Sequence, residues 1–416
     1  MSKSIVKSIK KCRTCASTKL KDFLYLGKMT MVNNFLTSYQ LNEPEPRFPL
    51  TTCLCLECGL VQTREVVDPE VLYKNYVYIS SFSQTMADHF QNLAKSLVSR
   101  FNLTSTSLVV EIGSNDGTLL QLFKNLGVRV LGVDPAKNLA KVANQNGIET
   151  WDTFFNKAVA KRIIKEKTED VSLVIGTNVF AHIDNLEDIL EGLNLMLGDR
   201  GVFVAEFPYL VDLVQETQFD TIYHEHLSYF SVKPLVHLFD RFNLELFDVE
   251  RTPVHGGSII IYVRKKGSKP TASKNVSQLL ALEEKLKIHD IKTLKSFAKK
   301  VEIIKKDLIL LLTRLKKQNK KIVGFGAPAK GNILLNYCGI DNKLIDYLTD
   351  NIPYKHGLYS PGTHLQVFPQ EKIMQDKPDY VLLLAWNFKE EILRKLKDYR
   401  SQGGKVIVPI PKVEIL

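Results

Sequence analysis

The chain has 416 residues, of which 44% are hydrophobic and 24% charged, and its formal net charge is +11. One hydrophobic core rarely extends over this length, so we expect two or three domains. No apolar run approaches the roughly 18 residues that span a membrane, and no apolar stretch follows the basic start as in a signal peptide, so we expect a cytoplasmic protein.

The first 70 or so residues contain five of the six cysteines. Cys12 and Cys15 form one C-x-x-C pair, and Cys55 and Cys58 form another. Four thiolates produce the closed tetrahedral site of structural zinc, and this segment is too small to bury a core without such a metal. Cys53 stays open as an alternative ligand to Cys55, because alternate residues of a strand face the same side.

Strands and helices alternate from about residue 85 to residue 265. An amphipathic helix is expected at 85–100; strands at 107–112, 129–133, 172–176, 202–206, 244–250 and 258–264; and helices at 117–126 and 136–146. A further helix after 172–176 is expected to start at Asp184 as its capping residue. The alternation predicts an α/β domain whose mostly parallel sheet is covered by helices on both faces.

Glycines and carboxylates follow the first of these strands. Glu111 precedes a G-x-x-x-G loop, and Asp134 ends the next strand, where a carboxylate can accept hydrogen bonds from ribose hydroxyls. The spacing favours S-adenosylmethionine (SAM) over a dinucleotide, because no pyrophosphate has to be bound and a carboxylate suits a cation. An ordinary tight turn is the alternative. The expected cofactor-binding residues are Glu111, Gly113, Asn115, Asp116, Gly117, Asp134, Asn178 and Phe180.

The positive charge is concentrated further along the chain. Residues 264–321 contain 18 Lys and Arg against 5 Asp and Glu, a balance of +13, whereas the other 358 residues carry −2. This segment is helix-forming, and its apolar stripe is interrupted at His289, so we interpret the lysines as a solvated face. A zinc-containing nucleic-acid-binding protein is the alternative that the charge invites.

A second strand-helix series completes the chain. Strands are expected at 321–325, 344–349, 380–385 and 405–409, and helices at 329–337 and 390–399. Residues 324–329 satisfy G-x-G-x-x-A, with Asp350 at the end of the next strand, which alone suggests a dinucleotide site.

The motifs taken together resemble those of the sugar C-methyltransferases that act on nucleotide-linked keto-deoxysugars. The resemblance rests on the cysteine pairs, on residues 111–117, 223–230 and 324–332, and on 355–357, 361–364 and 384–387. It implies three α/β parts: a zinc-binding module (1–70), a Rossmann-like SAM-dependent methyltransferase domain (71–270), and a helical connector with a Rossmann-like domain that meets the nucleotide-sugar (271–416).

The sequence Tyr223-His224-Glu225-His226 places four proton-transferring groups in one turn, before a helix that Ser231 is expected to cap. Methylation of carbon requires a base with a pKa near neutrality and a donor for the developing oxyanion. The resemblance implies that His226 is the base. Glu225 can orient it, and Tyr223, His224 and His182 can hold the keto oxygen.

Residues outside this turn are expected to contact the substrate. Tyr76 and Tyr78 resemble a family segment that lines the active site, although packing aromatics are an equal alternative. His255 begins the last strand of the domain and is expected to approach the sugar closely, although a simple hairpin turn explains the glycines after it as well. A helix start with a nearby lysine favours a diphosphate. The expected residues there are Lys330, Asn332, Tyr354 and Lys355.

The resulting hypothesis is a SAM-dependent C-methyltransferase acting on a dTDP- or GDP-linked 4-keto-deoxysugar, at C3, in deoxysugar biosynthesis. An O- or N-methyltransferase on a nucleotide-sugar is the alternative within the same class. We expect a monomer or weak oligomer, and no nucleic-acid or membrane partner.

Overall fold

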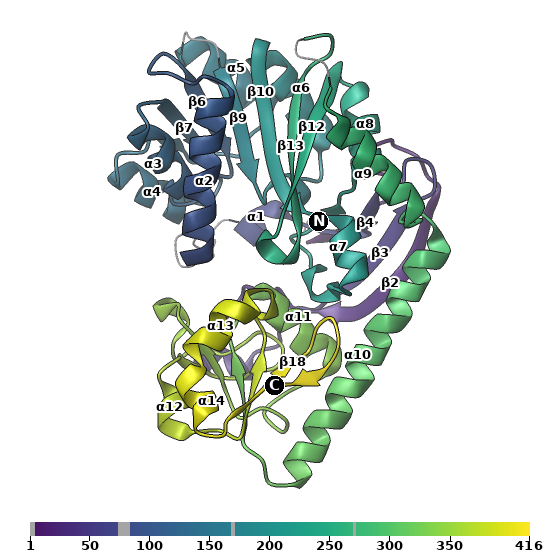
Figure 1. Cartoon of the computed structure of the whole chain (residues 1–416), viewed down its shortest axis with the longest axis vertical. Coiled ribbons are helices and arrows are strands. Elements are labelled where there is room, and N and C mark those ends of the chain that lie inside the picture. The colour runs from purple at the N-terminus through teal and green to yellow at the C-terminus, as the bar shows by residue number, and fades with distance from the viewer. Residues whose placement is uncertain (1–4, 74–83, 168–170, 269–271) are drawn as a thin grey trace.

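The structure is a computed structural model that describes residues 5–73, 84–167, 171–268 and 272–416. Figure 1 shows three parts: an N-terminal module, an upper α/β domain, and a lower α/β domain that a long helix connects to the upper one. The predicted α/β class and its three-part organisation are confirmed. Among the described residues, no helix combines the length and apolarity needed to cross a membrane.

The N-terminal module is a small antiparallel structure. Its elements are β1 (Val6–Ser8), β2 (Leu20–Met29), β3 (Phe48–Cys55), β4 (Val61–Thr63), β5 (Glu65–Val67) and α1 (Pro69–Tyr73). Strands β2, β3 and β4 pair in that order, and β4 also pairs with β11 (Ser228–Tyr229) from the middle domain. The module and the loop before β11 are therefore hydrogen-bonded into one sheet.

The middle domain contains a twisted sheet of seven strands within the described residues. Its elements are α2 (Gln84–Arg100), β6 (Leu108–Ile112), α3 (Thr118–Asn125), β7 (Arg129–Val133), α4 (Lys137–Gln145), β8 (Thr150–Trp151), α5 (Lys157–Lys167), β9 (Val171–Thr177), α6 (Leu186–Met196), β10 (Leu197–Pro208), α7 (Leu210–Gln215), α8 (Val232–Asp240), β12 (Leu244–Thr252) and β13 (Ser258–Lys265). The strand order is β12-β13-β10-β9-β6-β7-β8; β13 is antiparallel to both of its neighbours, β12 and β10, and the other pairs are parallel. The carboxyl ends of the parallel strands consequently meet at one edge, where ligands bind in such sheets.

Two predicted helix caps are wrong, because tertiary partners occupy the expected residues. Asn185, and not Asp184, accepts the hydrogen bond at the start of α6, while Asp184 forms ion pairs with Lys7 and Arg13. At α8 the Ser231 hydroxyl instead contacts His289. The carboxylate of Glu283 accepts from the first backbone N–H groups of α8.

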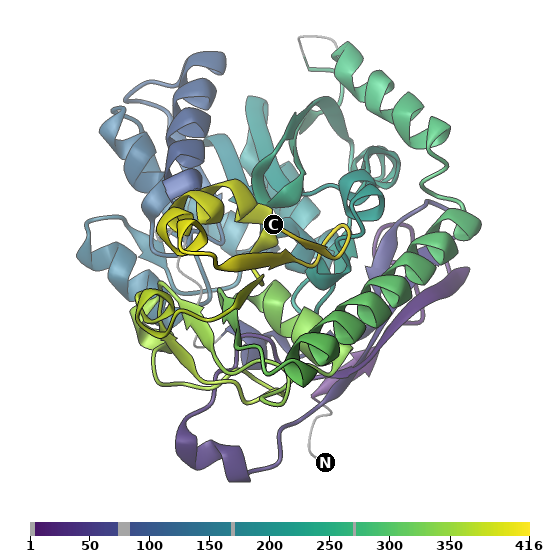
Figure 2. The ribbon, with the colours of Figure 1, turned by 60° about the horizontal axis from the view of Figure 1, so that its bottom comes forward.

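The helical connector confirms the predicted stripe and its interruption. It consists of α9 (Lys274–Lys285) and α10 (Ile291–Lys317), and the break between them contains His289. The buried face of α10 is formed by Leu294, Phe297, Val301, Ile304, Leu308, Leu312 and Leu315. In Figure 2 this helix runs along β2, with Phe297 against Phe23 at 6.5 Å between ring centroids.

The C-terminal domain has a second mostly parallel sheet. Its elements are β14 (Ile322–Phe325), α11 (Ala329–Cys338), β15 (Leu348–Asp350), β16 (Val367–Pro369), α12 (Lys372–Asp376), β17 (Tyr380–Leu383), α13 (Lys389–Lys395), α14 (Lys397–Ser401), β18 (Lys405–Val408) and β19 (Glu414–Ile415). The order is β16-β15-β14-β17-β18-β19, and only β19 is antiparallel among these described strands.

Candidate active site

A cavity of about 800 Å³ lies where the three parts meet. The middle domain lines it with residues from the carboxyl ends of β6, β7 and β9 and with Tyr223 and His226. The C-terminal domain contributes residues after β14, β15 and β17, and the N-terminal module contributes Lys7 and Asn33. A ligand bound here would therefore contact all three parts of the chain.

The loop between β6 and α3 has the geometry of a ligand-binding turn. Gly113 has a φ of 71°, and a Cβ added there would lie 2.8 Å from the side chain of Val179, so only glycine fits. Asp134 closes the turn, because its two oxygens accept from the backbone N–H groups of Asn115 and Ala136, each at 2.8 Å. Burial raises the pKa of Asp134 to about 6.

Glu111 is a second carboxylate at this turn, and the backbone N–H groups of Asn115 and Ala136 donate to Asp134 instead. Glu111 is 3% exposed, lines the cavity, and its Oε2 has no hydrogen-bond partner among the described residues. Burial, together with the nearby carboxylates of Asp134 and Asp116, raises the pKa of Glu111 well above 4.5. A buried acidic group beside other acids favours a positively charged ligand, so the site fits the cationic cofactor SAM.

Six of the eight expected cofactor residues line the cavity: Glu111, Gly113, Asn115, Asp116, Asp134 and Asn178. Gly117 begins α3 with a φ of 80° and packs against α4 instead. Phe180 lies in the core, where its ring stacks on Phe230 at 5.3 Å and Phe207 at 6.1 Å. The structure therefore shows Phe180 packed in the core and not among the residues that line the cavity.

His226 is held in one orientation at the cavity wall. Its Nδ1 lies 2.8 Å from the carbonyl oxygen of Thr221. Since a carbonyl can only accept, Nδ1 carries the proton and Nε2 keeps its lone pair. Burial, with smaller contributions from the positive charges of His182 and Lys330, holds the pKa of His226 well below 6.5.

Two more of the predicted catalytic residues lie beside His226. The Tyr223 ring is 4.0 Å and the His182 ring 4.9 Å from the His226 ring, between centroids, and both residues line the cavity. Burial lowers the pKa of His182 to about 4, and its Nε2 has no hydrogen-bond partner in the described part of the chain.

The other two predicted catalytic residues are not among the residues that line the cavity, although Asn33, the partner of Glu225, does line it. His224 contacts the carbonyl oxygen of Pro49 through Nε2 at 3.0 Å, and Glu225 accepts from Asn33 at 2.7 Å. Both partners belong to the N-terminal module. These two side chains therefore connect the loop with the N-terminal module.

The C-terminal domain closes the cavity with a cationic wall. Lys330 is buried, donates to the carbonyl of His255 at 3.0 Å, and lies 5.4 Å from the centre of the Trp386 ring. Lys355 donates to the Ala327 carbonyl and pairs with Asp350 at 3.3 Å.

These two lysines, together with Tyr354 and His255, are the predicted substrate residues that line the cavity. Burial lowers the pKa of His255 to about 3. Asn332 instead donates to the Val32 carbonyl, and Tyr76 and Tyr78 lie outside the described residues.

Several cavity residues were not predicted from the sequence. Asn33 and Lys7 come from the N-terminal module, and 154–156 follow β8. The two-residue length of β8 leaves no alternating pattern to find. Asn33 lies in a segment rich in turn residues, where asparagine is common for conformational reasons, so the sequence does not mark it as a ligand-binding residue.

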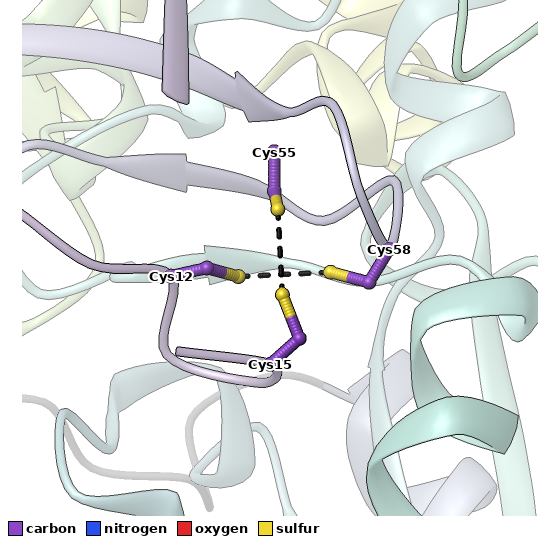
Figure 3. A group of neighbouring side chains, drawn as sticks. All are labelled: Cys12, Cys15, Cys55 and Cys58. Atoms are coloured by element: carbon purple, nitrogen blue, oxygen red, sulfur yellow. Dashed lines mark hydrogen bonds between the residues drawn. The ribbon is translucent and has the colours of Figure 1, made fainter. Parts of the chain in front are cut away.

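The cysteine pairs form one cluster (Figure 3). The sulfurs of Cys12, Cys15, Cys55 and Cys58 all lie within 4.8 Å of one another and point to a common centre from two loops. Sulfur pairs are 3.6 Å apart between Cys12 and Cys58 and 3.5 Å between Cys15 and Cys55. Tetrahedral zinc with Zn–S bonds of about 2.3 Å requires similar spacing, so the four residues fit this metal. Cys53 is fully buried outside the cluster, so Cys55 and not Cys53 belongs to the group that fits the metal.

Three family models match the chain. Residues 12–73 match one described as "Putative zinc binding domain", residues 86–249 a "Methyltransferase domain", and residues 253–411 a "C-methyltransferase C-terminal domain".

The chain is also similar to individual proteins and to solved structures. The C-methyltransferase NovU of Streptomyces niveus is 36% identical over 412 residues, covering 99% of this chain and 98% of NovU. An uncharacterized methyltransferase of Schizosaccharomyces pombe, C70.08c, is 27% identical over 128 residues, covering 30% of this chain and 48% of that protein. The crystal structure of PH0226 from Pyrococcus horikoshii has a TM-score of 0.37 and 16% identity, covering 45% of this chain and 95% of PH0226.

Proposed function

Because this chain belongs to the family of SAM-dependent C-methyltransferases, we propose that it methylates a carbon, C3, of a nucleotide-linked 4-keto-deoxysugar. The reaction would belong to deoxysugar biosynthesis. The sugar's nucleotide would be a dTDP or GDP group.

The orientation of His226 is the observation that carries this proposal. Its Nδ1–H is fixed by the Thr221 carbonyl, so the basic Nε2 is available at the cavity wall. Its lowered pKa keeps the ring neutral and free to accept a proton at neutral pH, and makes it a weaker base than the near-neutral pKa expected from the sequence. A base at this position can remove the proton from carbon that C-methylation requires, and the family match supports carbon over oxygen or nitrogen as the acceptor.

The ketone next to the reacting carbon makes that carbon acidic. His226 Nε2 would take the C3 proton, and the electron pair would move onto the C4 keto oxygen as an enolate. Tyr223 and His182, both beside His226, would donate hydrogen bonds to this oxygen. SAM supplies the electrophilic methyl group when it is bound. We assign His224 and Glu225 to holding the loop.

The C-terminal domain would hold the nucleotide-sugar. Lys330 and Lys355 place two positive charges in the cavity wall near the start of α11, where free backbone N–H groups favour a diphosphate. Asp350, which would bind a ribose in a dinucleotide site, already accepts from the Ala327 N–H and pairs with Lys355. The ion pair with Lys355, which has no counterpart at Asp134 among the described residues, supports a nucleotide-sugar over a second dinucleotide.

Proton exchange without methyl transfer tests the proposal. The wild-type protein, incubated in deuterated water with a dTDP-linked or GDP-linked 4-keto-deoxysugar and no SAM, should replace the hydrogen at C3 with deuterium, as read by NMR. His226→Ala should slow this exchange and the methylation by about 100-fold or more, with SAM affinity near normal. His237→Ala, at an exposed position of α8, is the matched control.

Two results would contradict the proposal. Methylation by His226→Ala at the wild-type rate would reject the base. Methyl transfer by the wild type without any exchange at C3, onto oxygen or nitrogen of the product, would favour the O- or N-methyltransferase alternative.

A further inference from the structure

Arg13 lies inside the metal-binding loop, between Cys12 and Cys15, yet its side chain extends away from the cysteines. The side chain is 2% exposed, which places a permanently charged guanidinium in the interior. Burial of such a group is costly unless its donors are used; here Nε and Nη1 have acceptors, whereas Nη2 has none among the described residues.

The guanidinium donates to three separate segments. Nη1 donates to the carbonyl oxygens of Thr63 at 2.8 Å and Leu227 at 3.1 Å, and Nε pairs with Asp184 Oδ1 at 3.0 Å. The side chain of Gln62 accepts from both the Arg13 backbone N–H and Nη1, each at 3.2 Å. Arg13 thus connects the metal loop with β4 and with two loops of the middle domain.

Those two loops carry the proposed catalytic histidines. Leu227 directly follows His226, and Asp184 lies two residues after His182. The Leu227 N–H also donates to the Ala181 carbonyl at 2.9 Å, so the loops contact each other at the point that Arg13 bridges. The relative position of the two rings, 4.9 Å apart, therefore depends on the same small network.

The backbone of Arg13 is held by the cysteine cluster. Its neighbours Cys12 and Cys15 contribute two of the four sulfurs, and Cys55 and Cys58 contribute the others from the end of β3 and the following turn. A bound zinc ion would link the Cys12–Cys15 segment with the Cys55–Cys58 segment. It would thereby fix the backbone of Arg13, from which the guanidinium extends.

We propose that Arg13 is a positioning residue for methyl transfer, through which the zinc-binding loop sets the geometry of His226 and His182. The inference rests on the proposed function, because it assumes that these histidines act on the substrate. It gives the metal module a role in the reaction without contact between the metal and the substrate.

Arg13→Lys is the test variant, because lysine keeps the charge near Asp184 but lacks the planar donor set that reaches the Thr63 and Leu227 carbonyls. We expect one zinc per chain, SAM affinity within about threefold of wild type, and a kcat lowered by about 10-fold to 100-fold with KM for the nucleotide-sugar little changed. Arg64→Lys is the matched control: Arg64 lies in the same module and donates to Asp22, Ile9 and Leu20, away from the catalytic loops. It should keep the wild-type kcat.

Hydrogen-deuterium exchange of the zinc-loaded proteins supplies a readout that needs no substrate. In Arg13→Lys, segments 181–185 and 223–230 should exchange faster than in wild type, while β2 and the control variant should not change. Arg13→Gln, which removes the charge, should show the same pattern more strongly and serves if the lysine variant folds poorly.

The outcomes separate the two proposals. Unchanged exchange in both segments, or a wild-type kcat in Arg13→Lys, overturns the positioning role. An equal loss of kcat in Arg64→Lys also overturns it, because the effect would then be general destabilisation of the module. If the wild-type protein exchanges no C3 hydrogen of a keto-sugar, the result contradicts the proposed function alone. The backbone hydrogen-deuterium exchange of segments 181–185 and 223–230 still tests whether Arg13 positions these loops.

Discussion

At the scale of single residues, the chemistry of the site follows from residue types at strand ends, but the contacts do not. Glu111 and Asp134 are both acidic groups at strand ends; Glu111 has an oxygen without a partner among the described residues, whereas Asp134 accepts from backbone N–H groups. His224 and His226 differ by two positions, yet His226 lines the cavity and His224 contacts the Pro49 carbonyl. Sequence identifies such groups, whereas the backbone path of an irregular loop decides which of them face the cavity.

The raised pKa of Glu111 predicts a pH-dependent cofactor affinity. A bound cation favours the ionised carboxylate, so SAM binding should release a proton wherever the pH lies below the pKa of Glu111 in the free protein. Affinity should therefore rise as the pH increases from 4.5 toward that pKa and then level off. Glu111→Gln should bind SAM about 10-fold more weakly, or about 1.4 kcal/mol, and show a flatter dependence. Calorimetric titration at several pH values measures both effects.

The matched control for this measurement is the exposed Glu149→Gln. Asp134, with its pKa raised to about 6, titrates in the same range, so the comparison between Glu111→Gln and wild type isolates the contribution of Glu111. A pH dependence that is the same in both proteins would show that Glu111 stays in one protonation state when SAM binds.

At the scale of elements, hydrophobic periodicity predicted most strands and helices correctly, because it reports which face is buried. The strand at 107–112 and the helix at 85–100 appear as β6 and α2 with small shifts at their ends. Periodicity failed for β8, which is only two residues long, and for α5, which was not predicted. The caps at Asp184 and Ser231 failed because a cap competes with distant partners that a local pattern does not contain.

Helix α10 provides a direct test of the predicted buried stripe. Leu308 is fully buried, whereas Leu310, two residues later in the same helix, is 71% exposed. Leu308→Ala should lower the free energy of unfolding by about 2–5 kcal/mol through lost burial and a cavity. Leu310→Ala should change it by less than about 0.5 kcal/mol. Chemical denaturation of both variants gives the comparison, and similar values for the two would contradict the described packing of α10 on the module and the C-terminal domain.

At the scale of the whole molecule, the arrangement of the three parts was not predictable from the sequence. Pairing of β11 with β4 joins residues 228 and 62, and such long-range pairing leaves no local signal. The predicted solvated face agrees with the exposed lysines along α10, at Lys292, Lys295, Lys299, Lys300, Lys306 and Lys317. The cavity shared by all three parts arises only when the C-terminal domain contacts the segment before His226.

Trp386 contributes to that contact, together with the packing of Phe219 on Tyr337. The Trp386 hydrogen bond predicts how substrate turnover depends on docking of the C-terminal domain. The Trp386 indole N–H donates to Asp220 Oδ2 at 2.6 Å, and Asp220 is fully buried beside Thr221, whose carbonyl orients His226. Trp386→Phe would leave this carboxylate without its donor from the C-terminal domain. Hydrogen bonds to charged groups contribute about 1.5–3 kcal/mol, so kcat/KM for the nucleotide-sugar should fall by about 10-fold or more.

SAM affinity should stay near wild type in Trp386→Phe, because the expected cofactor residues all belong to the middle domain. The other tryptophan of the chain supplies the control, since Trp151→Phe removes a hydrogen bond to the exposed Glu149 at 3.2 Å and changes the ring over which Arg162 lies at 3.9 Å, both within the middle domain. Each variant retains one tryptophan, so its fluorescence reports folding in the same experiment. If both variants kept the wild-type kcat/KM, the Trp386–Asp220 contact would add stability alone, and the orientation of His226 would be independent of the C-terminal domain.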